Sequence, residues 1–299
     1  MDIHESILIN KNKIEVLYKG NKGPLIIILT GMACSFDEWY EVIEILSQNN
    51  RVLSFHRRGL GESEIGEESN NTESTVRDLV AIMNHFNIKE PIYLIGHSYG
   101  GLCAQHFVKI YPKIVAGMIL VDSTSVDLKE LDSLDLPILD EDTDEAWIEK
   151  CLNYATKEPK ELKRIISPTL NNKLRNLPIK AQQRLLDFQV NPSLYKAMAS
   201  EIKEWKKDAD FIKKLGDFPS VPLIVIGRDK EFTIKSQLKT GIPLWELRTF
   251  EEKWSELIAE QAKLSSKGKL YFASNSGHSI FLDRPDIIIE SIHRLTSYQ

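Results

Sequence analysis

The sequence predicts an α/β fold in which a mostly parallel sheet has helices on both faces and is interrupted by an all-helical insertion. Two observations carry this prediction. Short runs rich in β-branched residues alternate with longer helical runs, the order that builds right-handed βαβ units. Residues 123–219 break that rhythm, because they contain no convincing strand but several helical stretches separated by prolines.

The first half of the chain supplies most of the predicted strands. Segments 6–10 and 13–18 flank the polar pair Lys11-Asn12 and predict a β-hairpin. The run at 25–29 is apolar at every position, which is typical of a strand buried on both faces. A helix at 36–46, with Ser35 as its N-cap, leads to a strand at 51–55. We then expect a helix at 72–86, a strand at 91–95, a helix at 99–110 and a strand at 115–121.

The second half contains the insertion and the return to the sheet. Helices are expected at 141–155, 159–166, 178–188 and 192–205, followed by a strand at 221–226, a helix at 250–264, a strand at 269–273 and a helix at 285–295. Residues 231–247 show no pattern that assigns them to an element. The predicted domains are therefore a core of residues 1–123 and 208–299 and a helical cap of residues 124–207.

Composition excludes several classes of protein. Lys and Arg number 38 against 43 Asp and Glu, and this net charge of −5 argues against a nucleic-acid partner. The apolar run at 25–29 is far shorter than the ~20 residues of a membrane span, and no signal peptide is visible. The three cysteines, Cys34, Cys103 and Cys151, match neither a disulfide framework nor a metal site, which favours a cytoplasmic location. Nothing in the sequence indicates an oligomeric state.

The most informative motif is Gly96-His97-Ser98-Tyr99-Gly100, which fits G-x-S-x-G between a predicted strand and a predicted helix. A strand that turns abruptly into a helix holds the residue at the turn in a strained conformation. The hydroxyl of Ser98 would then lie above the sheet, beside the positive end of the next helix. This pattern predicts a nucleophilic serine.

A serine nucleophile needs a base, and the base needs an orienting acid. His278 is the predicted base because it follows the last strand, at the end of the sheet where ligands of open α/β sheets bind. Asp229 and Asp122 both follow predicted strands at that same edge. Asp229 is slightly preferred as the acid, and Asp122 is the alternative.

The site would also need donors for an oxyanion and a pocket for the substrate. The backbone amide of Tyr99 is one predicted donor, and the amide of Met32, in Thr30-Gly31-Met32 after the strand at 25–29, is the other. Phe36 and Trp39 lie near the predicted mouth and could line an apolar pocket, or could equally be core residues. No dinucleotide fingerprint, P-loop or metal-ligand cluster is present, so neither a cofactor nor a metal is implied.

Together these motifs resemble the α/β-hydrolase superfamily over nearly the whole chain. The motifs are the serine turn at 96–101, the loop at 30–32, the run Arg57-Arg58-Gly59-Leu60-Gly61 and Ser276-Gly277-His278 with the DRPD run at 283–286. The resemblance implies an eight-stranded sheet, a triad of Ser98, His278 and an acid, and a helical lid over the site. Epoxide hydrolases and haloalkane dehalogenases of this fold attack with aspartate, so Ser98 argues against both.

Three positions depart from the superfamily pattern. Thr30 stands where a histidine often precedes the oxyanion-loop glycine, and His56 stands where an aspartate often precedes the Arg-Gly turn. The usual position of the acid after the seventh strand is Lys230, with Asp229 one residue early. Some members place the acid after the sixth strand instead, which keeps Asp122 as the alternative.

The leading functional hypothesis is a serine hydrolase that cleaves a carboxylic ester or related acyl bond of a small molecule. A C–C bond hydrolase, a lactonase, a thioesterase and an aminopeptidase are alternatives on the same fold. An aminopeptidase needs acids that hold a substrate ammonium, and the lid offers the acidic run at 140–145. A non-enzymatic small-ligand receptor or signalling protein that retains the triad is the alternative from another class.

Overall fold

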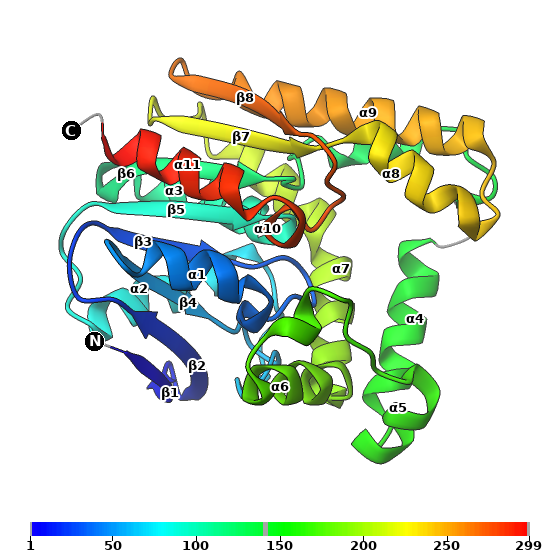
Figure 1. Ribbon diagram of the computed structural model, residues 1–299, viewed down its shortest axis with the longest axis horizontal. Coiled ribbons are helices and arrows are strands. Elements are labelled where there is room, and N and C mark those ends of the chain that lie inside the picture. The colour runs from blue at the N-terminus through cyan, green and yellow to red at the C-terminus, as the bar shows by residue number, and fades with distance from the viewer. Residues whose placement is uncertain (1, 140–142, 298–299) are drawn as a thin grey trace.

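The structure is a computed structural model that describes residues 2–139 and 143–297. Within these residues the centre is an eight-stranded sheet with the order β1-β2-β4-β3-β5-β6-β7-β8 (Figure 1). The first two pairings, β1 with β2 and β2 with β4, are antiparallel, and the others are parallel. The strands are β1 (Ile3–Ile9), β2 (Asn12–Lys19), β3 (Leu25–Leu29), β4 (Arg51–Phe55), β5 (Ile92–His97), β6 (Val115–Val121), β7 (Leu223–Arg228) and β8 (Gly268–Ala273). The predicted fold class is confirmed.

Two hydrophobic layers flank the sheet, because the apolar strands present side chains to both faces. In β3, Leu25, Ile27 and Leu29 join one cluster, whereas Ile26 and Ile28 join the other. The first layer is covered by α2 (Thr72–His85) and α3 (Tyr99–Ile110). The second is covered by α1 (Tyr40–Leu46), α10 (Ile280–Asp283) and α11 (Pro285–Thr296), which lie in front of the sheet in Figure 1.

Two local differences from the sequence prediction have simple causes. The hairpin turn is formed by Asn10 and Lys11, one residue earlier than expected, and both have the positive φ that a type I′ turn requires. The helix expected at 36–46 begins instead as a 3₁₀ turn, η1 (Phe36–Trp39), and continues as α1. Its N-cap is Ser35, as predicted, and Glu38 completes a capping box by accepting from the Ser35 amide.

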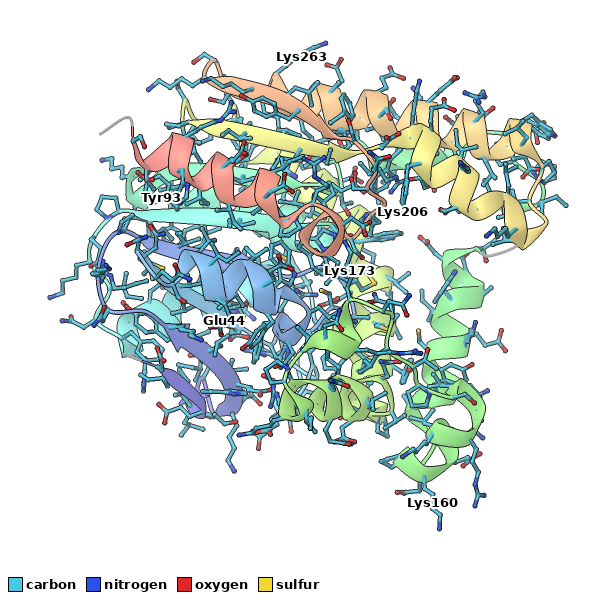
Figure 2. All side chains as sticks on the ribbon, viewed as in Figure 1. Glu44, Tyr93, Lys160, Lys173, Lys206 and Lys263 are labelled. Atoms are coloured by element: carbon cyan, nitrogen blue, oxygen red, sulfur yellow. The ribbon has the colours of Figure 1, made fainter. Side chains whose placement is uncertain are left out.

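A helical insertion separates β6 from β7, as the sequence predicts. It comprises η3 (Leu128–Ser133), α4 (Asp144–Ala155), α5 (Pro159–Ile166), η5 (Leu174–Asn176), α6 (Ile179–Gln189) and α7 (Pro192–Lys214). The expected domain boundary at 207/208 lies inside α7, which continues because Ala209 and Ile212 pack into the main core. Helices α4 and α5 extend away from the sheet, with Lys160 at the far end (Figures 1 and 2).

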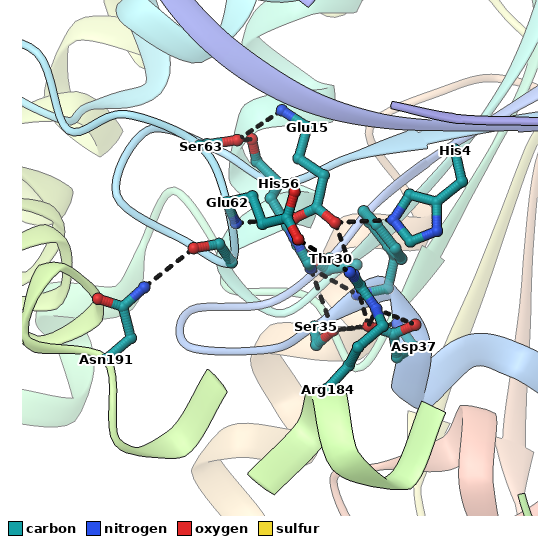
Figure 3. A network of polar contacts seen from close by, with 12 residues as sticks. His4, Glu15, Thr30, Ser35, Asp37, His56, Glu62, Ser63, Arg184 and Asn191 are labelled. Atoms are coloured by element: carbon teal, nitrogen blue, oxygen red, sulfur yellow. Dashed lines mark hydrogen bonds and ion pairs between the residues drawn. The ribbon is translucent and has the colours of Figure 1, made fainter. Parts of the chain in front are cut away.

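Charged contacts tie the insertion to the core. Arg184 of α6 donates to Glu15 of β2 at 2.6 Å and to Asp37 of η1 at 3.0 Å (Figure 3). Lys173, which Figure 2 labels beside α10, donates to the Leu282 carbonyl and pairs with Asp283 at 3.4 Å. The insertion is thus anchored to β2 and η1 at one place and to α10 at another.

The network around Glu15 explains the unexpected histidine at position 56. Glu15 is fully buried and accepts from His56 Nδ1 at 2.6 Å and from His4 Nε2 at 2.7 Å (Figure 3). Burial alone would raise the pKa of Glu15, but these two histidines hold it well below its ordinary value. The carboxylate that an aspartate would supply after β4 therefore comes from β2 instead.

Residues 231–247, which the sequence pattern left unassigned, form most of a helical pair after β7. This pair consists of α8 (Lys230–Gln237), the turn η6 (Leu238–Thr240) and α9 (Leu244–Ala262). Asp229 caps α8 by accepting from the Phe232 amide, and Gly241 ends the turn in a left-handed conformation. Helix α9 then returns along β7 and β8 (Figure 1). Within the described ranges, none of the helices combines the length and apolar character of a membrane span.

Candidate active site

Ser98 lies at the junction of β5 and α3, where the motif predicts it. Its backbone angles, φ 52° and ψ −125°, are strained for a residue with a side chain. Its amide donates to the Val121 carbonyl at 3.2 Å, and its carbonyl accepts from the Thr124 amide at 3.1 Å. Backbone hydrogen bonds from the end of β6 and the loop after it therefore hold the turn that carries Ser98. Asp122 is the residue that follows Val121.

The predicted oxyanion loop, residues 30–32 after β3, packs directly against this turn. A Cβ at Gly100 would lie 2.2 Å from the Leu29 carbonyl oxygen, and one at Gly31 would lie 3.2 Å from Ser98 Cβ. Only glycine permits both approaches. Tyr99 is the first residue of α3, where backbone amides have no partner inside the helix. Met32 follows Gly31, so both predicted oxyanion donors belong to segments that meet beside Ser98.

A buried arginine is hydrogen-bonded to the backbone of the oxyanion loop. Arg57 donates to the Thr30 carbonyl at 2.6 Å and to the Gly31 carbonyl at 3.0 Å. Its remaining donors form a bidentate pair with Glu201 of α7, at 2.7 and 3.1 Å. The loop position is thus linked to the helical insertion through one guanidinium, a role that the Arg-Gly turn did not reveal in the sequence.

His278 lies on the loop between β8 and α10, beside the serine turn. His97 Nε2 contacts the His278 carbonyl oxygen at 3.0 Å, and the two ring centroids are 4.6 Å apart. Burial and the neighbouring His278 lower the pKa of His97 to about 3, so His97 is neutral near pH 7. The side chain of His278 remains 42% exposed, open to a reactant.

The structure pairs Asp122, rather than Asp229, with His278. The Asp122 Oδ2 to His278 Nδ1 distance is 2.6 Å. The preference for Asp229 is therefore wrong on contact geometry, because its carboxylate accepts from the Phe232 and Asn275 amides at 3.1 and 3.0 Å. Asp229 acts as the N-cap of α8, a role that Asp fills well.

Asp122 is fully buried and its charge is compensated. Burial alone would raise its pKa, but the Arg228 guanidinium and the hydrogen bond from His278 hold the pKa well below its ordinary value. Oδ2 accepts from Arg228 Nη1 at 3.0 Å, and Oδ1 accepts from Trp254 Nε1 at 3.0 Å. Sequence reasoning missed Arg228 and Trp254. The one available signal was an arginine at the carboxyl end of a buried strand.

A cavity of about 530 Å³ lies between the oxyanion loop and the insertion. Ala33 and Glu38 line it from the loop side, and burial raises the pKa of Glu38 to about 7. The apolar lining from the insertion consists of Ile166, Leu170, Leu174, Leu185, Phe188, Leu194 and Met198. Thr169, Asn171, Gln189 and Tyr195 complete the lining, to which Ser98 and His278 do not contribute. The volume lies within the range typical of small-molecule sites.

Phe36 and Trp39 are packing residues rather than pocket residues, so the pocket expectation for them is corrected. Trp39 is fully buried and stacks on Phe281 at 4.5 Å between ring centroids. Phe36 is 1% exposed and stacks on His56 at 3.9 Å. Both side chains turn into the structure because the 3₁₀ turn packs its apolar face inward, which leaves Ala33 and Glu38 to face the cavity.

Among the described residues, no group of three or more His, Cys, Asp or Glu is arranged to hold a metal ion. The groups described above lie at one edge of the sheet, at the carboxyl ends of its parallel strands. A strained serine, a histidine paired with a buried carboxylate and two segments with backbone donors meet there.

The chain shares sequence with known proteins over parts of its length. Over 138 residues the chain is 28% identical to a soluble epoxide hydrolase of Corynebacterium sp., covering 45% of this chain and 46% of that protein. It is 27% identical over 111 residues to a proline iminopeptidase of Lactobacillus crispatus, covering 36% and 37% of the two chains. The chain thus matches less than half the length of these curated relatives.

A solved structure with the same architecture is a thermophilic esterase from Thermogutta terrifontis. It aligns with a TM-score of 0.66 over 99% of this chain and 98% of the esterase, at 19% identity, which shows a common fold. The family model described as "alpha/beta hydrolase fold" matches residues 24–206, more than half of the chain. The chain belongs to the α/β-hydrolase fold family.

Proposed function

We propose that this hydrolase is a serine esterase that cleaves a carboxylic ester or related acyl bond of a small molecule. The observation that carries the proposal is the 2.6 Å contact of Asp122 with His278 Nδ1, beside a serine in a strained strand–helix turn. That contact leaves Nε2 of His278 as the nitrogen that accepts a proton.

The reaction follows from these groups. Ser98 Oγ attacks the acyl carbon as His278 Nε2 takes its proton, and buried Asp122 stabilises the resulting imidazolium. The amides of Met32 and Tyr99 donate to the oxyanion, each contributing about 3–4 kcal/mol to transition-state stabilisation. His278 then protonates the leaving alkoxide, and water activated by the same imidazole releases the acid and frees Ser98.

Several features favour an ester over an epoxide or an amino-acid amide. The cavity beside the oxyanion loop is lined mostly by apolar side chains, which suits an acyl or alkyl chain of moderate size. Epoxide hydrolases of this fold attack with aspartate, whereas this position is Ser98. The acidic run does not favour an aminopeptidase, since Asp144 accepts from Trp205 Nε1 and pairs with Lys206, while residues 140–142 lie outside the described residues.

The proposal extends to location and to the insertion. Cys34, Cys103 and Cys151 are free and buried, which supports a reducing compartment such as the cytoplasm. The insertion lines one side of the cavity, which supports the proposal that residues 124–207 form a lid over the site. No cofactor is invoked, and the proposed partner is a small-molecule substrate.

The test is turnover of p-nitrophenyl esters from two to twelve carbons, compared with amino-acid p-nitroanilides. We expect ester hydrolysis with an optimum at intermediate chain length, and loss of at least about 10⁴-fold in kcat on Ser98→Ala. Ser133→Ala, on the exposed turn η3, is the matched control and should leave kcat unchanged. Full esterase activity in Ser98→Ala would refute the mechanism, and fluorophosphonate labelling without turnover would favour a receptor.

A further inference from the structure

A buried ion pair stands directly behind the proposed triad acid. Arg228, the last residue of β7, donates through Nε to Glu251 Oε2 at 2.9 Å and through Nη2 to Oε1 at 2.5 Å. The Arg228 side chain is 7% exposed and that of Glu251 is fully buried. The third nitrogen, Nη1, reaches Asp122, so one guanidinium bridges two carboxylates.

Both oxygens of Asp122 are occupied by donors from this cluster. Oδ1 accepts from the Arg228 amide at 3.1 Å and from Trp254 Nε1 at 3.0 Å, and Oδ2 accepts from Arg228 Nη1 and His278 Nδ1. The Trp254 ring also lies under the guanidinium, with Cζ 4.5 Å from its centroid. Rotation of the carboxylate would break several bonds at once, so the cluster fixes the direction of the bond to His278.

We propose that Arg228 and Glu251 are positioning residues that hold Asp122 in the orientation that bonds to His278. The inference rests on the proposed role of His278 as the base. Buried ion pairs can often be replaced by apolar residues of similar volume with little loss of stability, so a stabilising role alone does not account for a pair at this place. Its position does have a consequence for catalysis, since it is bonded to the carboxylate that faces the imidazole.

The charges around His278 can be counted from each neighbouring element. Asp122 and Glu251 supply two negative charges and Arg228 one positive charge, giving −1 in the resting site and zero when the imidazolium forms. His97 stays neutral, and Asp283, on α10, accepts from the Gly277 amide. One further carboxyl group and one further cation lie on adjoining segments. Asp229 caps α8, and Arg57 is paired with Glu201.

Removing either partner should therefore loosen Asp122 and lower kcat. Arg228→Met deletes the donor to Asp122 Oδ2 and the guanidinium that lies over Trp254, and we expect kcat to fall by up to about 10²-fold. Glu251→Gln leaves Arg228 one acceptor instead of two, so the guanidinium is held less firmly and we expect a smaller fall in kcat, of about 3–10-fold.

The experiment measures kcat and KM for the best p-nitrophenyl ester, alongside the NMR signal of the His278 Nδ1 proton that bonds to Asp122, assigned by His278→Asn. Arg228→Lys retains the charge without the fork and should lower kcat while leaving KM near that of the native protein. The matched control is Asp78→Asn, which breaks the buried Arg58–Asp78 pair elsewhere in the fold and should not move the His278 signal.

A fall in kcat at unchanged KM in Arg228→Met, together with a displaced or lost His278 Nδ1 proton signal, supports the proposal. Native kcat and a native Nδ1 signal in both Arg228→Met and Glu251→Gln overturn it. If Arg228→Met does not fold, Arg228→Lys and Glu251→Gln decide the question by the same two measurements, because both keep a polar side chain of similar size. The NMR readout does not need turnover, so an inactive native protein would refute the esterase proposal separately.

Discussion

The choice between Asp122 and Asp229 as the triad acid makes the sharpest mutational prediction. In Asp122→Asn the amide must place its NH₂ at one of the two oxygen sites. At Oδ1 the NH₂ would face the Arg228 and Trp254 N–H donors, whereas at Oδ2 it would face His278 Nδ1 and Arg228 Nη1. The second orientation is less unfavourable, because His278 can shift its proton from Nδ1 to Nε2 and accept.

That tautomer is the wrong one for catalysis. With the proton on Nε2, the imidazole of His278 cannot accept the proton of Ser98, although the geometry of the site is preserved. We expect kcat to fall by roughly 10³–10⁴-fold, which corresponds to about 4–5.5 kcal/mol in the activation free energy. The assay is initial-rate hydrolysis of the best p-nitrophenyl ester, with circular dichroism to verify folding.

Asp229→Asn is the matched control. The Asp229 carboxylate accepts from the Phe232 amide, which caps α8, and from the Asn275 amide in the loop after β8. Asn caps helices about as well as Asp does. We expect kcat within about twofold of the native value. A large loss in Asp229→Asn together with normal activity in Asp122→Asn would refute the assignment drawn from the contacts.

Three further predictions concern stability and the loops around the site. Gly100→Ala places a Cβ 2.2 Å from the Leu29 carbonyl and should cost at least about 2 kcal/mol in urea unfolding; a smaller loss would contradict the packing argument. Burial raises the pKa of Asp208 from 3.8 to about 6, so between these pH values the folded protein binds a proton that the unfolded chain has lost. The free energy of unfolding should therefore fall by up to about 3 kcal/mol as the pH rises from 4 to 6. Asp208→Asn should abolish this pH dependence of the unfolding free energy. Arg184→Met leaves Glu15 with fewer donors and should lower the unfolding free energy by about 1–3 kcal/mol, whereas an unchanged value would show the anchor is dispensable.

The fold could be predicted from the sequence because its signals are local. An uninterrupted apolar run such as 25–29 predicts a buried strand without knowledge of its neighbours, and the structure buries all five residues. The strand–helix turn at Ser98 was visible for the same reason, since glycine, serine and the change of periodicity occur within six residues. Residues 231–247 were missed because α8 depends on a cap, Asp229, that was interpreted as a catalytic acid.

The acid could not be chosen from the sequence because both candidates follow strands at the same edge of the sheet. What separates them is a set of contacts between distant segments. Asp229 finds donors from its own helix and from Asn275, while Asp122 finds Arg228, Trp254 and His278. Phe36 and Trp39 illustrate the same limit, because apolar residues beside a site face the core or the cavity according to the packing of the turn that carries them.

The position of the acid also accounts for the helices that follow β7. A carboxylate buried at the end of β6 is stable only if donors reach it from neighbouring strands and helices. Arg228 of β7 supplies two donors to Asp122, its amide and Nη1, and its own charge is balanced by Glu251 of α9, the helix that returns along the sheet. Helix α9 meets this need and adds Trp254 one turn later. On this argument an acid at position 122 and the helical pair α8–α9 depend on each other, so shortening α9 should impair the His278–Asp122 pair more than the cavity.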